Sequence, residues 1–236
     1  MSIYFFRMKR IIFLLLLFVT LKVAFAQPTS GTTGLLNTPS AEMQRDGTFM
    51  FGGNYLPEAM MPAEFDYNTG NYFLNSTFLP FLEVNIRFTL LKIKSIGKFN
   101  QDRSVALRGR LLKESHYLPS FVVGVNDIYS LRPKPVNQYF SSMYLVTSKN
   151  LFWSKNRLEI SVGYGFKAFK HNQITGIFGG MAFSPGCFKS LRLMAEYDSK
   201  VVNAGGSITL FNHLQIVVFA YDLTYLAGGL AYKVYL

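Results

Sequence analysis

The sequence predicts an all-β protein, an antiparallel transmembrane β-barrel of about 12 strands that follows a cleaved signal peptide. Three observations support this fold class. From residue 46 to residue 236, segments of about ten residues alternate apolar and polar side chains, and turn residues separate them. The first residues resemble an export signal. The chain also contains 23 Phe and 14 Tyr, as the aromatic girdles of membrane barrels require.

The export signal has the three expected regions. Basic residues lie within 7–10, an apolar segment follows at 11–21, and small residues at 24 and 26 form a cleavage site. We therefore expect residues 1–26 to be a signal peptide. A retained helical anchor is the alternative, but Lys22 interrupts the apolar run, and a spanning helix needs about 20 apolar residues. The cleavage site has no Cys near it, so we expect no lipid anchor there.

The net charge restricts the class of partner, and the single cysteine restricts the kind of site that the chain can form. Without residues 1–26 the chain keeps 20 basic and 13 acidic residues, a net charge of +7. For an exported protein this charge favours anionic lipid or polysaccharide as partners, and we expect no contact with nucleic acid. Cys187 is the single cysteine, which excludes an internal disulfide and a Cys-based metal site. We expect no metal and no cofactor.

The chain then divides into a lead-in and a barrel. Residues 27–46 have no strand rhythm, and we expect either a periplasmic lead-in or a plug inside the lumen. Residues 47–236 form the predicted outer-membrane barrel, with its clearest alternation at 82–90. The predicted strands are 47–56, 70–79, 82–93, 103–113, 119–128, 138–148, 156–166, 173–183, 189–198, 201–210, 213–221 and 226–236.

An even number of strands places both ends of the barrel on the periplasmic side. The tight connections 79–81 and 211–213 then lie on that side, and the longer connections 57–69 and 129–137 lie outside. The connection 57–69 is apolar for a surface loop, so it either folds over the barrel mouth or forms a docking patch. The faces of 70–79, 138–148 and 173–183 cannot be assigned from their alternation.

The strands that alternate clearly turn a set of charged residues toward the lumen. Six are basic and three are acidic: Glu83, Arg87, Arg108, Arg110, Arg157, Glu159, Arg192, Glu196 and Lys233. One interpretation is a salt-bridged interior that stabilises the barrel. The other is a basic lining that guides an anionic glycan or an ion.

Four stretches carry a resemblance to a known family. They are GLLNTPSA at 34–41, LPFLEV at 79–84, a block from DRSV at 102–105 to SMYLVTSK at 142–149, and AEYD at 195–198. In these residues the chain resembles the YjbH-like family of outer-membrane proteins, which is tied to exopolysaccharide and capsule production. The well-known members look longer and are lipoproteins with a second barrel-like half, so this chain looks like a short, single-barrel version.

The resemblance implies a role in secreting or assembling surface polysaccharide, and it supplies no catalytic residues. The histidines at 116, 171 and 213 are far apart and show no metal-ligand spacing, so we do not expect an enzyme. We therefore expect a bacterial outer-membrane component of exopolysaccharide export or surface assembly. A small-solute or ion channel and a structural or adhesion barrel are the alternatives. Expected partners are membrane lipid, anionic polysaccharide, the barrel-assembly machinery and periplasmic export proteins.

Overall fold

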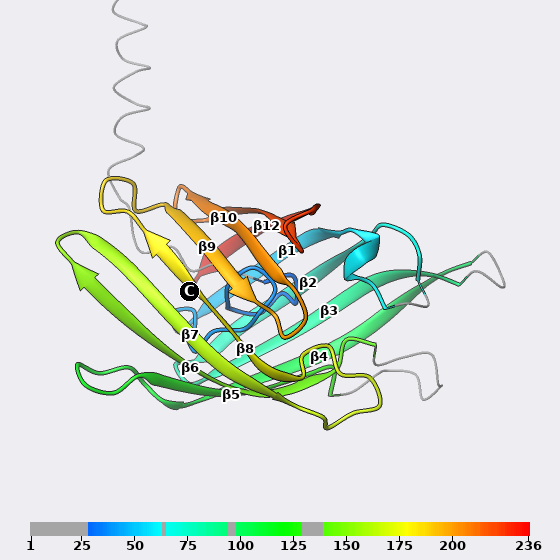
Figure 1. The fold of residues 1–236 in the computed structure, drawn as a ribbon, viewed down its shortest axis with the longest axis horizontal. Helices are drawn as coiled ribbons and strands as arrows, with labels where there is room; N and C mark the ends of the chain where they lie inside the picture. Colours follow the sequence, from blue (N-terminus) through cyan, green and yellow to red (C-terminus); the bar gives the residue numbers. More distant parts are fainter. Residues whose placement is uncertain (1–27, 63–64, 94–97, 129–138) are drawn as a thin grey trace, which may run out of the picture.

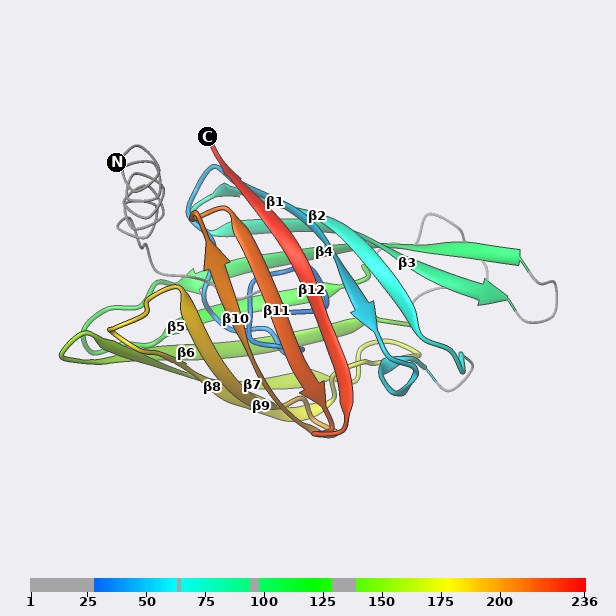
Figure 2. The same ribbon diagram turned by 90° about the horizontal axis from the view of Figure 1, so that it is seen from above.

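The protein is a closed antiparallel β-barrel of twelve strands (Figure 1 and Figure 2). The computed structural model describes residues 28–62, 65–93, 98–128 and 139–236, so the expected signal peptide lies outside the described residues. Each strand pairs with the next one in the chain, and β1 pairs with β12 to close the ring. The predicted fold class, an all-β antiparallel barrel of about 12 strands, is therefore confirmed.

The strands follow the predicted order along the chain. Their bounds are β1 Thr48–Leu56, β2 Thr69–Leu79, β3 Leu82–Ile93, β4 Lys98–Leu112, β5 Ser120–Asn126, β6 Ser142–Trp153, β7 Asn156–Phe166, β8 Gly176–Ser184, β9 Leu191–Tyr197, β10 Val202–Leu210, β11 Leu214–Tyr221 and β12 Tyr225–Tyr235. A single turn of 3₁₀ helix, η1 (Glu58–Met60), follows β1. Within the described ranges, no helix has the length and apolar character needed to cross a membrane.

Two strands extend beyond their predicted bounds. β4 starts at Lys98 instead of residue 103, because its pairing with β3 continues to the end of that strand. β6 ends at Trp153 instead of residue 148, and a tight turn through Ser154, with a φ of 55°, leads into β7. The polar residues that follow position 148 interrupt the apolar alternation, but the ladder of backbone hydrogen bonds continues through them.

The two ends of the barrel differ. At the end that holds Thr48 and Tyr235, here called the terminal end, the connections 80–81 and 154–155 are two-residue turns. The opposite end, here called the loop end, carries the connection between β1 and β2 and the one between β5 and β6. Figure 2 shows the start of β1 beside the C-terminus.

Buried and exposed residues alternate along the strands. On β3, Glu83, Asn85 and Arg87 are buried inside the barrel, whereas Ile86 and Leu90 are exposed on its outer face. This is the reverse of a soluble barrel, because the polar side chains are inside and the apolar ones outside.

Four lumen-facing aromatic rings lie against glycines on the neighbouring strand. For example, Tyr144 is the direct cross-strand partner of Gly124, and a Cβ added to that glycine would lie 2.3 Å from the tyrosine ring. The other pairs are Gly52 with Phe73, Gly163 with Phe178 and Gly205 with Phe219. These glycines leave room for rings that lie along the wall. Three of the rings belong to 70–79, 138–148 and 173–183, whose faces could not be assigned, because an inward ring interrupts the alternation of polar and apolar side chains.

We predict that Gly205→Ala destabilises the barrel by about 1–3 kcal/mol, because the added methyl group overpacks the wall. A Cβ at this position would lie 2.3 Å from the Cβ of Phe219 and 2.4 Å from the backbone oxygen of Val218, so the clash cannot be relieved by a rotamer change. Gly109→Ala is the matched control, because the nearest atom there is 3.9 Å away. Urea titration of the purified barrel, with the SDS-resistant fraction as the measure of folded protein, gives the unfolding midpoint of each variant. Equal midpoints for the two variants would contradict this account.

Candidate functional site

The structure places the predicted charged residues on the lumen side of the wall. Arg110, near the terminal end, is partly exposed. The others are buried, each with at most 9% of its surface exposed: Glu83, Arg87, Arg108, Arg157, Glu159, Arg192, Glu196 and Lys233. A side chain on the inner wall is this deeply buried only where protein covers it, so most of this set does not line an open pore.

Residues 28–46 supply that cover. They run inside the ring of strands, where both ribbon views show them in blue (Figure 1 and Figure 2). The Nδ2 atom of Asn71 donates to the backbone oxygen of Thr29 at 2.8 Å, and that of Asn85 donates to the backbone oxygen of Ser30 at 3.0 Å. We call residues 28–46 the plug. Because it has no regular secondary structure, its backbone groups depend on such partners in the wall.

Glu196 on β9 holds the centre of the plug. Its carboxylate accepts hydrogen bonds from the backbone N–H groups of Leu36 at 3.0 Å, Asn37 at 2.7 Å and Thr38 at 3.2 Å. The Thr38 hydroxyl adds a fourth at 2.8 Å, and the Nδ2 atom of Asn203 donates from the adjacent strand at 3.0 Å. Consecutive backbone N–H groups form a concave anion site, so this glutamate is a docking group for the plug.

A buried ion pair holds the next part of the plug. Glu83 and Arg108 are direct cross-strand partners on β3 and β4, 2.6 Å apart and completely buried. The same guanidinium donates to the backbone oxygens of Ser40 and Glu42 in the plug. The carboxylate also accepts from the backbone N–H of Thr33 at 2.7 Å. A buried ion pair is stable only when its remaining hydrogen-bonding groups are satisfied, and here the plug satisfies part of them.

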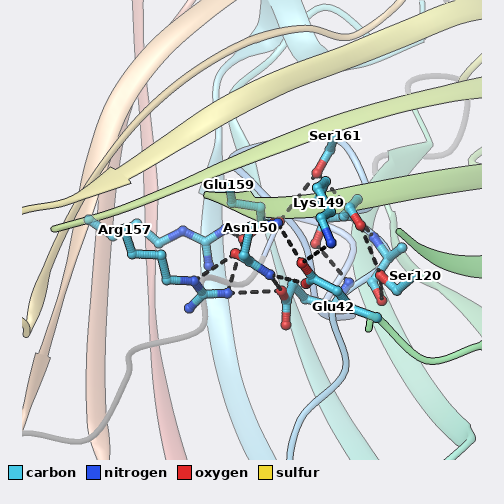
Figure 3. A network of polar contacts seen from close by, with 12 residues as sticks. Glu42, Ser120, Lys149, Asn150, Arg157, Glu159 and Ser161 are labelled. Atoms are coloured by element: carbon cyan, nitrogen blue, oxygen red, sulfur yellow. Dashed lines mark hydrogen bonds and ion pairs between the residues drawn. The ribbon is translucent and has the colours of Figure 1, made fainter. Parts of the chain in front are cut away.

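A second ionic network lies toward the terminal end (Figure 3). Arg157 contacts Glu42 of the plug at 2.8 Å and Glu159 at 3.6 Å, and Glu159 contacts Arg192 at 2.7 Å. Burial and the nearby Glu159 raise the pKa of Glu42, while Arg157 acts in the opposite direction. The sequence analysis missed Glu42 as a site residue, because it lies in a segment with no strand pattern.

Apolar contacts complete the filling of the lumen. Leu35 and Leu36 of the plug are fully buried in a cluster with Met194 and Phe219 of the wall. A second cluster packs Ala41 and Met43 of the plug against Tyr144, Val146 and Phe178. Three of the rings that lie opposite glycines, those of Tyr144, Phe178 and Phe219, therefore belong to the wall side of these contacts.

At the loop end, the connection between β1 and β2 folds over the barrel mouth. Met61 and Phe65 pack with Phe140 in one buried cluster. The guanidinium of Arg87 lies over the Phe140 ring, 4.6 Å from its centroid. Below this cover, burial raises the pKa of Asp127 to about 7, with Asp102 adding to the shift and Arg87 opposing it.

Comparison of the sequence with models of known protein families identifies the family of this chain. A sequence model described as "Exopolysaccharide biosynthesis protein YbjH" matches residues 26–176, which is more than half of the chain. The chain belongs to the YjbH family. The matched region contains the plug and strands β1 to β7, so the segment that fills the lumen is part of what this chain shares with the YjbH family. The family resemblance inferred from the sequence is confirmed.

One curated YjbH relative is also similar. It is the "Uncharacterized lipoprotein YjbH" of Escherichia coli (strain K12), 30% identical over 150 residues. The aligned region covers 60% of this chain and 19% of that lipoprotein. The region of the relative that this chain matches is thus about a fifth of the relative's length.

We predict that Glu196→Ala loosens the plug, because three buried backbone N–H groups lose their acceptor at a cost of about 1–3 kcal/mol each. A Ser40→Cys reporter, in a chain with Cys187→Ser, places an isosteric thiol at a completely buried plug position. Maleimide labelling of this thiol should be at least about tenfold faster with Glu196→Ala. Glu58→Ala, which removes an exposed carboxylate, is the control. Equal labelling rates would show that Glu196 does not hold the plug.

Proposed function

We propose that this protein is a plugged outer-membrane β-barrel that takes part in the export or surface assembly of exopolysaccharide. Membership of the YjbH family implies an exopolysaccharide-related function, and this is the observation that carries the proposal. The barrel supports it, because a closed barrel is one of the two structures that satisfy every backbone polar group within a bilayer.

The outer surface supports a position in a membrane. Its exposed side chains along the strands are mainly apolar, including Val162, Leu193 and Val218. Stacked aromatic pairs lie toward both ends: Tyr72 with Phe88 at the loop end and Trp153 with Phe183 at the terminal end. Two aromatic girdles around an apolar band are typical of outer-membrane barrels.

The filled lumen distinguishes this proposal from a permanently open channel. Leu36 of the plug and Arg108 and Tyr144 of the wall lie in different parts of the interior, and each is completely buried. Passage of a solute or a glycan through the barrel would require the plug to move. A polysaccharide-linked barrel that is closed at rest is consistent with this arrangement, whereas a general diffusion pore requires an open one.

We predict that Val162→Arg destabilises the membrane-inserted barrel by about 2–4 kcal/mol, the cost of an arginine on the lipid-facing side near the bilayer midplane. Val162 is 52% exposed on the outer face of β7. The yield of folded protein in the outer-membrane fraction and its urea midpoint in lipid vesicles measure the effect. Val162→Leu keeps the side chain apolar and should behave as the parent does. An unchanged midpoint for Val162→Arg would show that this face does not contact lipid.

The function is tested by measuring surface polysaccharide in a strain that lacks this gene, beside its parent and a complemented strain. We expect the deletion to lower surface polysaccharide and complementation to restore it. Complementation with Glu58→Ala should equal the parent, and complementation with Glu196→Ala should not. Unchanged polysaccharide in the deletion strain would refute the proposal and favour the channel or adhesion alternatives.

A further inference from the structure

A cavity of about 270 Å³ lies at the terminal end of the lumen. The plug forms one side of it through Glu42. The wall lines the rest with residues of both charges, polar residues and an aromatic ring: Arg110, Lys113, Glu114, Ser120, Asn150, Phe152 and Arg157. Figure 3 shows the side chains of Glu42, Asn150 and Arg157 directed toward one another. The cavity is the entrance to the part of the lumen that the plug closes.

Phe152 is unusual among the inward-facing aromatic side chains. It has the same phase along β6 as Tyr144, Val146 and Ser148, which are buried inside the barrel. Phe152 lies near the end of β6, past the last residue of this strand that pairs with β5, and 71% of its surface is exposed. Its direct cross-strand partner is Arg157. A flat apolar ring is therefore presented to the entrance beside charged groups.

The acidic side chains at this cavity already have basic or amide partners. Glu42 accepts from Arg157 at 2.8 Å and from the Nδ2 atom of Asn150 at 2.6 Å. Glu114 lies 3.4 Å from the Nζ atom of Lys149 and accepts from the backbone N–H of Asn150 at 2.9 Å. Both carboxylates are therefore engaged at close range, although Glu42 also attracts Arg110 electrostatically over a longer distance.

The basic side chains of Arg110 and Lys113 differ in this respect. Arg110 donates to the backbone oxygen of Pro80, which leaves other N–H groups of its guanidinium for a ligand. Among the residues that the structure describes, no acidic side chain forms an ion pair with Arg110 or Lys113. Within the described part of the chain, the entrance thus holds two cations that form no close ion pair, next to an exposed aromatic ring.

We infer that this cavity is a binding subsite for an acidic sugar unit of the uronic acid class. The sugar carboxylate pairs with Arg110 and Lys113, and the apolar face of the sugar ring lies on Phe152. Sugar hydroxyls donate hydrogen bonds to the carboxylate of Glu42 and to the amide oxygen of Asn150, whose N–H groups already donate to Glu42 and Glu114. Guanidinium–carboxylate pairs combine charge with a fixed, two-pronged geometry, which selects an acidic unit over a neutral one. This inference rests on the proposed function and specifies the class of glycan.

The test is calorimetric titration of the purified full-length barrel in detergent micelles with tetragalacturonate, and with maltotetraose as a neutral tetrasaccharide of equal length. We expect tetragalacturonate to bind at least about tenfold more tightly, one ion pair being enough for that ratio. Phe152→Ala and the double variant Arg110→Ala with Lys113→Ala should each weaken its binding by about tenfold or more. Lys170→Ala and Phe211→Ala, which truncate exposed side chains of the same types elsewhere, should leave it unchanged.

Three outcomes of the titrations would contradict the inference. Equal affinity for the two tetrasaccharides, no binding of tetragalacturonate, or unchanged affinity in both cavity variants would overturn the inference. A heat-shifted band in SDS electrophoresis shows that every variant is folded. If the deletion strain loses polysaccharide while the purified barrel binds no tetragalacturonate, the subsite fails and the proposed function stands. If the deletion strain keeps its polysaccharide, the proposed function fails whatever the titration shows.

Discussion

The structure depends on one constraint, which is that an irregular segment inside a closed barrel must find hydrogen-bond partners without water. The plug has one β-bridge of its own, between Gly34 and Pro39. A few further backbone hydrogen bonds lie within the plug, such as the one from the N–H of Thr29 to the oxygen of Leu36. The wall provides many of the remaining partners, chiefly Glu196, Arg108 and Asn71, which bind backbone atoms of the plug. Each buried backbone group left unpaired would cost about 1–3 kcal/mol, so the lumen is polar where it surrounds the peptide groups of the plug.

The apolar part of the interior follows from the same arrangement. Leu35 and Leu36 need an apolar surface to pack against, and Phe219 provides part of it. An inward ring would fill the lumen if it stood upright, so glycines such as Gly124, opposite Tyr144, let the ring lie flat on the adjacent strand. The inside of this barrel therefore combines a polar network with several small hydrophobic clusters.

Much of the barrel could be predicted from the sequence, because alternation with a period of two determines which side chains face inward. It placed Glu83, Arg108 and Glu196 in the lumen, where the structure has them. It could not predict their partners, since those are backbone atoms of the plug, and backbone atoms leave no signal in a sequence. The strands with inward rings could not be oriented for a related reason. Their inward rings place apolar side chains on both faces and so interrupt the alternation, although other residues on the same inner faces, such as Asn75 and Ser148, are polar.

The order of the chain has a consequence for assembly. The plug is joined to β1 through Gly47, whose backbone oxygen accepts from the N–H of Leu236. The last pairing that closes the ring, between β1 and β12, therefore joins the first strand to the last one. Because the plug precedes β1, its C-terminal end is attached at the seam where the first and last strands pair. The barrel thus encloses the segment that was synthesised before its wall, and the strand pair that closes the ring also carries the attachment of that segment.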